Sequence, residues 1–204
     1  MKASRCNCVL LLALLSGCTG LQQSEQVIDW DARRAELLAI DDWSLRGRVA
    51  IKAADGGGNA SLDWLQRNAV SRLRMAGPFG AGGVELTVAP DRVTFSDRSG
   101  ENSLNYAGPQ AAERFMDEQL GWSFPVRSAR YWVLGLLDPG YRGDRLFDSE
   151  GELLSLQQHG WTVVYDRFAV RNGLFLPAKL EMESPRLRLR VVISDWVADS
   201  GLTQ

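Results

Sequence analysis

Apolar and polar residues alternate along most of this chain, with the period of two that is typical of half-buried β-strands. In the segment Trp43–Ile51 the odd positions are mostly apolar, while Arg46 and Arg48 lie on the opposite side. Similar alternation recurs in short runs, and these are residues 60–64, 73–75, 84–88, 93–95, 103–106, 161–165, 178–183 and 187–193. Turn signals stand between many of them, at 55–59, 68, 97–100, 149–151, 159–160 and 172–173. Short strands joined by tight turns predict an antiparallel meander.

Helical spacing of apolar residues replaces this alternation in three places. Two lie in the middle of the chain and predict helices over 110–120 and 126–136, the second ended by Pro139 and Gly140. The third predicts a helix over 30–40, with Asp29 as its N-cap. The fold class is therefore mainly β (α+β), with an N-terminal helix. A sheet of this length should curl toward a barrel, and the two central helices are candidates for covering its open, apolar side.

The beginning of the chain carries an export signal. Lys2 and Arg5 precede a seven-residue apolar run, Val9–Leu15, which is much shorter than the ~20 residues of a membrane-spanning helix. The run ends in Leu15-Ser-Gly-Cys18, which matches the bacterial lipobox. In a lipobox the cysteine thiol is lipidated and becomes the first residue of the mature protein. We expect the mature protein to be held on a membrane by acyl chains on Cys18.

The lipobox divides the chain into three parts. Residues 1–17 are interpreted as a lipoprotein signal peptide, 18–28 as a lipidated tether, and 29–204 as a single domain. Thr19 stands next to the lipidated cysteine, where Asp favours retention in the inner membrane of enterobacteria, so the outer membrane is weakly favoured.

Composition argues against several classes of function. A net charge of −2 gives no electrostatic case for nucleic-acid binding. The single histidine, His159, lies in an expected hairpin turn, so neither a metal site nor a histidine-based hydrolase is expected. The glycine runs lack the Lys-Ser/Thr and the following helix of a phosphate-binding P-loop, and we expect no cofactor.

Three arginines alternate with leucine in Arg186-Leu-Arg-Leu-Arg190. These arginines could bind a phosphate or a lipid headgroup. Alternatively, they form cross-strand ion pairs with Glu181 and Glu183 on the preceding strand. The ion pairs are the preferred interpretation.

The segment Gly77-Pro-Phe-Gly-Ala-Gly-Gly83 interrupts the strand pattern and places the aromatic Phe79 in a glycine-rich connection. Phe79 is expected to insert into a bilayer or to dock on a partner, unless it folds back on the sheet edge. Transfer of one Phe side chain out of water is worth roughly 1.5–3 kcal/mol, enough for transient contact but not for anchoring.

Taken in order, these motifs resemble the LolB family of the bacterial lipoprotein-localisation pathway. The resemblance rests on the lipobox, the polar tether, the Trp-x-Leu-Arg-Gly-Arg strand at 43–48, the Gly-Pro-Phe-Gly loop at 77–80, and the helical segment Arg130-Tyr-Trp-Val-Leu-Gly-Leu136. It extends over about Trp30–Trp196.

The resemblance implies an incomplete antiparallel barrel with a helical lid over an apolar cavity. It implies a monomeric, periplasm-facing protein of the outer membrane that accepts lipoproteins from the soluble carrier LolA by their acyl chains and inserts them into outer-membrane lipid. The family commonly has Leu, in Asn-Pro-Leu-Gly, at the exposed loop position needed for insertion. The matching residues here are Gly77, Pro78, Phe79 and Gly80.

Acyl chains need an apolar concavity, because each methylene costs about 0.8 kcal/mol in water. The candidate cavity residues on the sheet are Val49, Ile51, Leu62, Trp64, Leu73, Met75, Leu86 and Val88, with Phe115, Met116 and Trp132 from the lid. Any one of them is equally consistent with an ordinary core. The alternative function is therefore a lipoprotein scaffold or adaptor of outer-membrane assembly with a solid core, and a periplasmic hydrolase is disfavoured because the chain lacks a suitable base.

Overall fold

The computed structural model describes residues 30–54, 56–80, 82–120 and 123–198. The expected lipidation site Cys18, signal peptide, tether and N-cap Asp29 all lie outside the described residues. The first half of the chain forms α1 (Trp30–Leu38), β1 (Asp42–Ala53), β2 (Gly56–Arg67), β3 (Val70–Ala76), the 3₁₀ helix η1 (Pro78–Gly80), β4 (Val84–Ala89), β5 (Arg92–Asp97) and β6 (Ser103–Ala107). The second half forms α2 (Ala111–Leu120), α3 (Val126–Trp132), β7 (Asp144–Phe147), β8 (Leu153–Gln158), β9 (Trp161–Arg171), β10 (Leu174–Glu183) and β11 (Leu187–Ala198).

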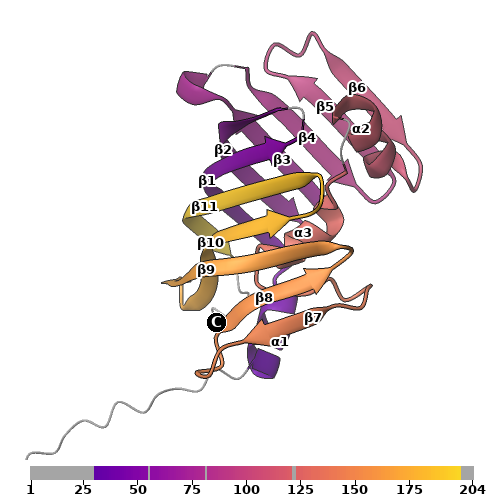
Figure 1. The fold of residues 1–204 in the computed structure, drawn as a ribbon. Coiled ribbons are helices and arrows are strands. Elements are labelled where there is room, and N and C mark those ends of the chain that lie inside the picture. Colours follow the sequence, from indigo (N-terminus) through magenta and orange to yellow (C-terminus); the bar gives the residue numbers. More distant parts are fainter. Residues whose placement is uncertain (1–29, 55, 81, 121–122, 199–204) are drawn as a thin grey trace, which may run out of the picture.

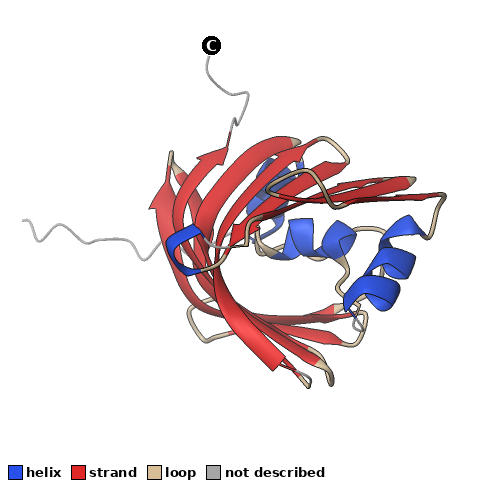
Figure 2. Ribbon diagram, turned by 90° about the horizontal axis from the view of Figure 1, so that it is seen from above, coloured by secondary structure: helices blue, strands red, loops and turns tan. Residues whose placement is uncertain are grey.

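The strands form one antiparallel sheet of 11 strands, in the order β6-β5-β4-β3-β2-β1-β11-β10-β9-β8-β7 (Figure 1). Two meanders, β1–β6 and β7–β11, are joined where β1 pairs with β11. The sheet curls strongly, and α2 and α3 lie across its open side (Figure 2). The expected fold class, a curved antiparallel sheet forming an incomplete barrel with a helical lid and an N-terminal helix, is confirmed.

The pairing of β1 with β11 contains a bulge between Arg46 and Gly47. A Cβ atom at Gly47 would lie only 2.2 Å from the carbonyl oxygen of Val192. The glycine of the Trp-x-Leu-Arg-Gly-Arg strand is therefore required by the close approach of the two backbones.

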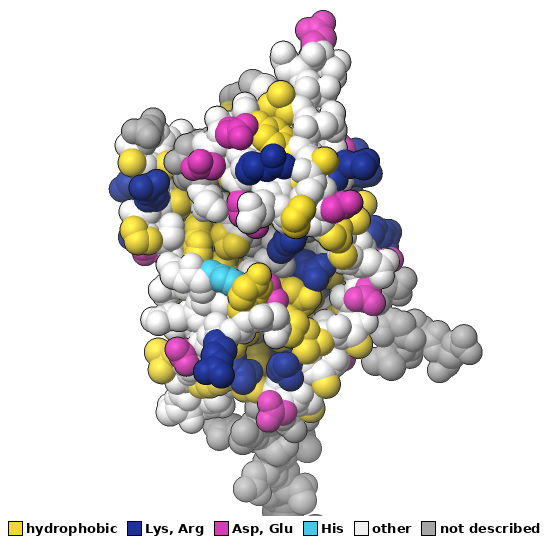
Figure 3. Space-filling model, turned by 90° about the vertical axis from the view of Figure 1, so that its right-hand side faces the viewer, with side chains coloured by type: hydrophobic (Ala, Val, Ile, Leu, Met, Phe, Trp, Pro, Cys, Tyr) yellow, Lys and Arg dark blue, Asp and Glu magenta, His cyan; other side chains and the backbone are white. Residues whose placement is uncertain are grey.

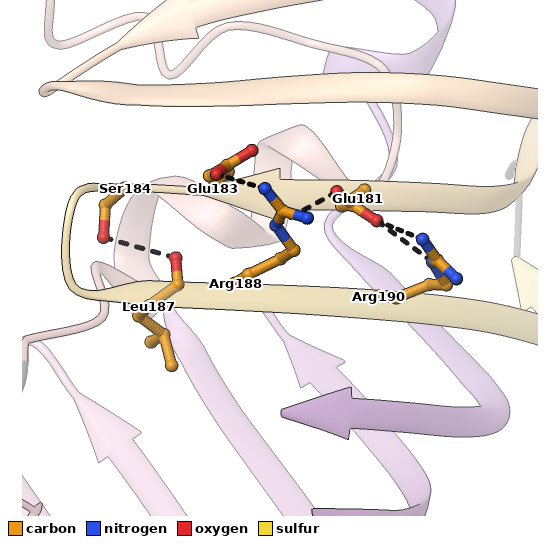
Figure 4. A network of polar contacts seen from close by, with 6 residues as sticks. All are labelled: Glu181, Glu183, Ser184, Leu187, Arg188 and Arg190. Carbon is orange, nitrogen blue, oxygen red and sulfur yellow. Dashed lines mark hydrogen bonds and ion pairs between the residues drawn. The ribbon is translucent and has the colours of Figure 1, made fainter. Parts of the chain in front are cut away.

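The strands bury one face and expose the other, as the alternation predicts. In β11 the residues Leu187, Leu189, Val191 and Ile193 are buried, and those between them are exposed. On the outer face Arg188 Nη2 lies 2.6 Å from Glu183 Oε1, and Arg190 Nη2 lies 2.8 Å from Glu181 Oε2 (Figure 4). The expected ion pairs between β10 and β11 are confirmed for Arg188 and Arg190. Because they lie at the surface, each contributes little to stability.

α1 is fixed to the sheet by a buried cation. The guanidinium of Arg33 lies 4.4 Å from the ring centroid of Trp30, 4.8 Å from that of Phe175 and 5.3 Å from that of Phe168. Its Nη2 atom donates a hydrogen bond to the carbonyl oxygen of Phe175. Burial lowers the pKa of Arg33 to about 10, which leaves it charged at neutral pH. Cation–π contacts thus hold α1 on the sheet.

Two local predictions were wrong. The glycines at 56–58 belong to β2 rather than to a turn, because they pair with Ile51, Lys52 and Ala53 of β1. The second central helix ends at Trp132, followed by a turn in which Gly135 has a φ of +82°. The strands β7 and β8, at one edge of the sheet, were not predicted from the alternation.

Candidate acyl-chain cavity

An apolar cavity of about 80 Å³ lies between the concave face of the sheet and the lid helices α2 and α3. Among the described residues, none of the side chains in its wall is ionisable. The wall consists of Val49, Ile51, Leu62, Trp64, Leu73, Met75, Leu86, Met116, Phe124, Val126, Val133, Met182, Leu189 and Val191.

Eight of the eleven predicted residues line this cavity, and these are Val49, Ile51, Leu62, Trp64, Leu73, Met75, Leu86 and Met116. Seven of them come from the four adjacent strands β1–β4, whose inward faces the pleat brings side by side. Val88, Phe115 and Trp132 are buried but are not among the residues around the void. The structure therefore gathers most of the predicted set at one place.

Sequence reasoning missed six wall residues, namely Phe124, Val126, Val133, Met182, Leu189 and Val191. The last three have the same strand alternation as the predicted ones. What assigns them to the cavity is the pairing of β1 with β11, in which Val49 lies opposite Val191 and Ile51 opposite Leu189. Residues so distant in the sequence are placed by tertiary structure alone.

α2 lies on the β5–β6 edge of the sheet. The ring centroid of Phe115 is 5.6 Å from that of Phe95 and 5.6 Å from that of Tyr106. The Tyr106 hydroxyl donates a hydrogen bond of 2.8 Å to Glu118, and this bond raises the pKa of Tyr106. Phe115 thus holds the helix in place, and Met116, the next residue, reaches the cavity.

α3 is tied to β8 and β9 by buried hydrogen bonds. Trp132 Nε1 donates to Gln158 Oε1 at 2.9 Å, and Ser128 Oγ donates to Asp138 Oδ2 at 2.7 Å. The Tyr165 hydroxyl donates a hydrogen bond of 2.8 Å to the carbonyl oxygen of Trp132. Burial raises the pKa of Tyr165 well above its ordinary value, so the phenol stays protonated and remains a donor. Trp132 therefore serves as an anchor of α3, and breaking this network would leave several buried polar groups unpaired.

The cavity is small for its proposed ligand. Its volume is about 80 Å³, so we expect the walls to move apart when a whole acyl chain enters.

The Gly77–Gly83 loop is braced by Arg98, from the turn between β5 and β6. Arg98 Nη1 donates to the carbonyl oxygen of Gly80 at 3.1 Å, and its backbone N–H donates to that of Gly83 at 2.7 Å. The backbone of Phe79 lies in η1, and its side chain lies outside what the structure describes. Gly80 has a φ of +78°, a conformation that favours glycine at this position of the motif.

A larger and open hollow of about 940 Å³ lies near the β7–β9 end of the molecule. Its lining includes Arg34, Arg142, Arg145 and the exposed His159. Figure 3 shows the side of the molecule on which α2 and α3 lie, with the histidine in cyan among basic and apolar side chains. This hollow is polar and contains none of the predicted acyl-chain residues.

The described residues also bear on two other kinds of function. No group of three or more His, Cys, Asp or Glu side chains is arranged there to hold a metal ion. Within the same residues, every helix is too short or too polar to cross a bilayer.

Comparison with known proteins gives the chain a family. The family model described as "Outer membrane lipoprotein LolB" matches residues 41–196. The outer-membrane lipoprotein LolB of Pseudomonas aeruginosa (strain LESB58) is 35% identical over 196 residues, which cover 91% of this chain and 91% of that protein. LolB of Pseudomonas putida (strain KT2440) is 34% identical over 202 residues, which cover 96% of this chain and 97% of that protein.

Among solved structures, a DUF1329 family protein from Desulfovibrio piger superposes with a TM-score of 0.51 at 9% identity, covering 85% of this chain and 93% of that one. At that identity the likeness concerns the fold alone. The match to the family model and the two relatives establish that this chain belongs to the LolB family of outer-membrane lipoproteins.

Proposed function

We propose that this protein is a lipid-anchored acceptor that takes lipoproteins from the periplasmic carrier LolA by their acyl chains and inserts them into the outer membrane. The observation that carries the proposal is the cavity between sheet and lid, whose described wall has only apolar and aromatic side chains. A chain of about fifteen methylenes costs roughly 12 kcal/mol in water at ~0.8 kcal/mol each, so it must stay covered during transfer.

Transfer through such a cavity needs no catalytic step. The wall offers no ionisable side chain, and His159 lies outside it. The cargo moves downhill, from a weaker apolar site on the carrier to this cavity and then to the bilayer, where burial of its acyl chains is complete.

Opening of the cavity is assigned to α2. α3 is held by the buried hydrogen bonds of Trp132, Ser128 and Tyr165. The side-chain hydrogen bonds that join α2 to Tyr106 of the sheet lie at the surface instead. Exposed bonds are the cheaper ones to break, because water replaces them. Met116 would leave the wall with α2.

Phe79 is assigned to the release step, and Cys18 to keeping the domain near the destination bilayer. The test follows a radiolabelled lipoprotein from LolA to this protein and on to liposomes. We expect Phe79→Glu to accept cargo normally and to release it poorly into bilayers, since a carboxylate at the loop tip opposes insertion. Val170→Glu, which places the same charge on an apolar residue that is 63% exposed in β9, is the matched control and should behave like the wild type. Unchanged delivery by Phe79→Glu would refute the role of the loop.

A second function, a scaffold or adaptor of outer-membrane assembly with a solid core, is favoured by the small volume of the cavity. A scaffold would not strip an acylated protein from LolA. Failure of the wild-type protein to capture cargo in the same assay would favour the scaffold.

A further inference from the structure

The methionines of this protein are gathered in one place. Apart from Met1, the chain contains only Met75, Met116 and Met182, and each of them lines the apolar cavity. The rest of the buried core of the described residues, from the β5–β6 edge of the sheet to β9, contains none. Methionine is thus confined to the cavity wall instead of being spread through the core.

The three side chains reach the cavity from different directions. Met75 of β3 and Met182 of β10 lie to either side of the strands β2, β1 and β11. Met116 belongs to α2, on the open side of the curved sheet (Figure 2). Met116 and Met182 are buried, whereas Met75 is half-buried. A change in the conformation of these side chains therefore alters the cavity from both flanks of the sheet and from the lid.

The rest of the wall has little freedom to adapt. Its sheet residues belong to strands that are joined by antiparallel pairing, and their side chains are branched or aromatic. A β-branched side chain, such as that of Val49 or Val191, is restricted at χ1. Methionine is unbranched, has three rotatable bonds and fills gaps of irregular shape. Since a cavity of about 80 Å³ must grow to hold an acyl chain, the methionines are the wall side chains best suited to move aside.

We propose that Met75, Met116 and Met182 form the adjustable part of the cavity wall and set the range of acyl-chain lengths that the cavity accepts. This inference rests on the proposed function, because it presupposes that an acyl chain enters the cavity. Leucine has nearly the volume of methionine but is branched, so exchanging the two changes the adaptability of the wall without opening a void. If the methionines served only to fill the core, the exchange would affect stability and not the range of ligands.

The test uses decanoate and palmitate, two fatty acids that differ only in chain length. The protein is the mature chain, residues 18–204, with Cys18→Ala, so that no attached acyl chain competes for the cavity. Affinities are measured by displacement of a fluorescent fatty acid, below the micelle concentrations of both probes. We expect the wild-type cavity to bind palmitate at least as tightly as decanoate.

The variant Met75→Leu/Met116→Leu/Met182→Leu should bind decanoate within about 2-fold of the wild type and palmitate about 10-fold more weakly, because a long chain then overpacks a stiff wall. Leu153→Met/Leu156→Met/Leu176→Met is the matched control, since it exchanges the same two residue types at buried positions outside the wall, and it should keep the wild-type ratio of the two affinities.

Three results would overturn the inference and leave acyl-chain binding intact. These are equal weakening of both probes in the leucine variant, an unchanged affinity of that variant for palmitate, and the same change of ratio in the control. Failure of the wild type to bind either probe would instead overturn the proposed function.

A second measurement needs no substitution, in case the leucine variant does not fold. The ¹³C shift of a methionine methyl group reports the rotamer of the last side-chain bond. In wild-type protein labelled at these methyl groups, the signals of Met75, Met116 and Met182 should move further with bound palmitate than with bound decanoate. Signals that move equally with both probes, or with neither, would show that the methionines do not adapt to chain length.

Discussion

The size of the apolar cavity leads to a quantitative prediction about the balance between stability and function. Val126 and Val133 line it from the α3 side and are 2% and 1% exposed. The double substitution Val126→Leu/Val133→Leu adds one methylene at each position, directed at the void. Leucine also has the better helix propensity, which suits Val126 in the first turn of α3.

The expected gain follows from the volume. At ~24 cal/mol per Å³, a void of about 80 Å³ lowers stability by roughly 2 kcal/mol relative to a filled core. Two buried methylenes at ~0.8 kcal/mol each give a similar figure, about 1.6 kcal/mol. The free energy of unfolding should therefore rise by about 1–1.5 kcal/mol, because the fit of the added groups is imperfect.

The capture of lipoprotein cargo should decrease while stability increases. The added methylenes occupy space that the first part of an acyl chain must fill, so capture of a lipoprotein from LolA should fall several-fold. Urea unfolding measures the stability and the transfer assay measures the capture. Val164→Leu, the same change at a β9 residue that is 43% exposed, is the control and should alter neither.

Two outcomes would refute this reasoning. A more stable protein with unchanged capture would show that acyl chains do not use this cavity. A protein destabilised by more than about 1 kcal/mol would show that the walls are too rigid for the void to be filled.

Three further predictions concern the frame around the cavity. Gly47→Ala should lower the free energy of unfolding by about 2–3 kcal/mol, because the new Cβ would lie 2.2 Å from the carbonyl oxygen of Val192. If urea unfolding showed a loss below about 0.5 kcal/mol, the close approach of the β1 and β11 backbones would not require glycine. Arg33→Ala should lower the free energy of unfolding by about 2 kcal/mol, because the cation–π contacts of Arg33 and its hydrogen bond are lost. If the variant were as stable as the wild type, the contacts of Arg33 with the aromatic rings would contribute nothing to stability. Arg98→Ala should leave the melting temperature nearly unchanged but speed hydrogen exchange at the Gly80 amide several-fold. Unaltered protection of that amide would mean that the Arg98 side chain does not hold the Gly77–Gly83 loop in place.

The period-two alternation predicted much of the fold because it is a local property. A pleated strand sends successive side chains to opposite faces, so Leu62, Trp64, Leu73 and Leu86 had to share one face whatever the curvature of the sheet. The central helices were equally visible from their spacing. The glycines at 56–58 were misjudged because their backbone hydrogen bonds come from β1, and pairing of that kind compensates for poor strand propensity.

The sequence by itself determined which residues share a face, where the chain turns, the lipobox at Cys18 and the Gly-Pro-Phe-Gly loop. Only the tertiary structure decided which apolar faces meet around a void. Val49 and Val191 lie on one cavity wall because β1 pairs with β11, and the void exists because the lid packs imperfectly on a curved sheet. Its volume depends on the sizes and positions of side chains that are far apart in the sequence, and no local pattern encodes it.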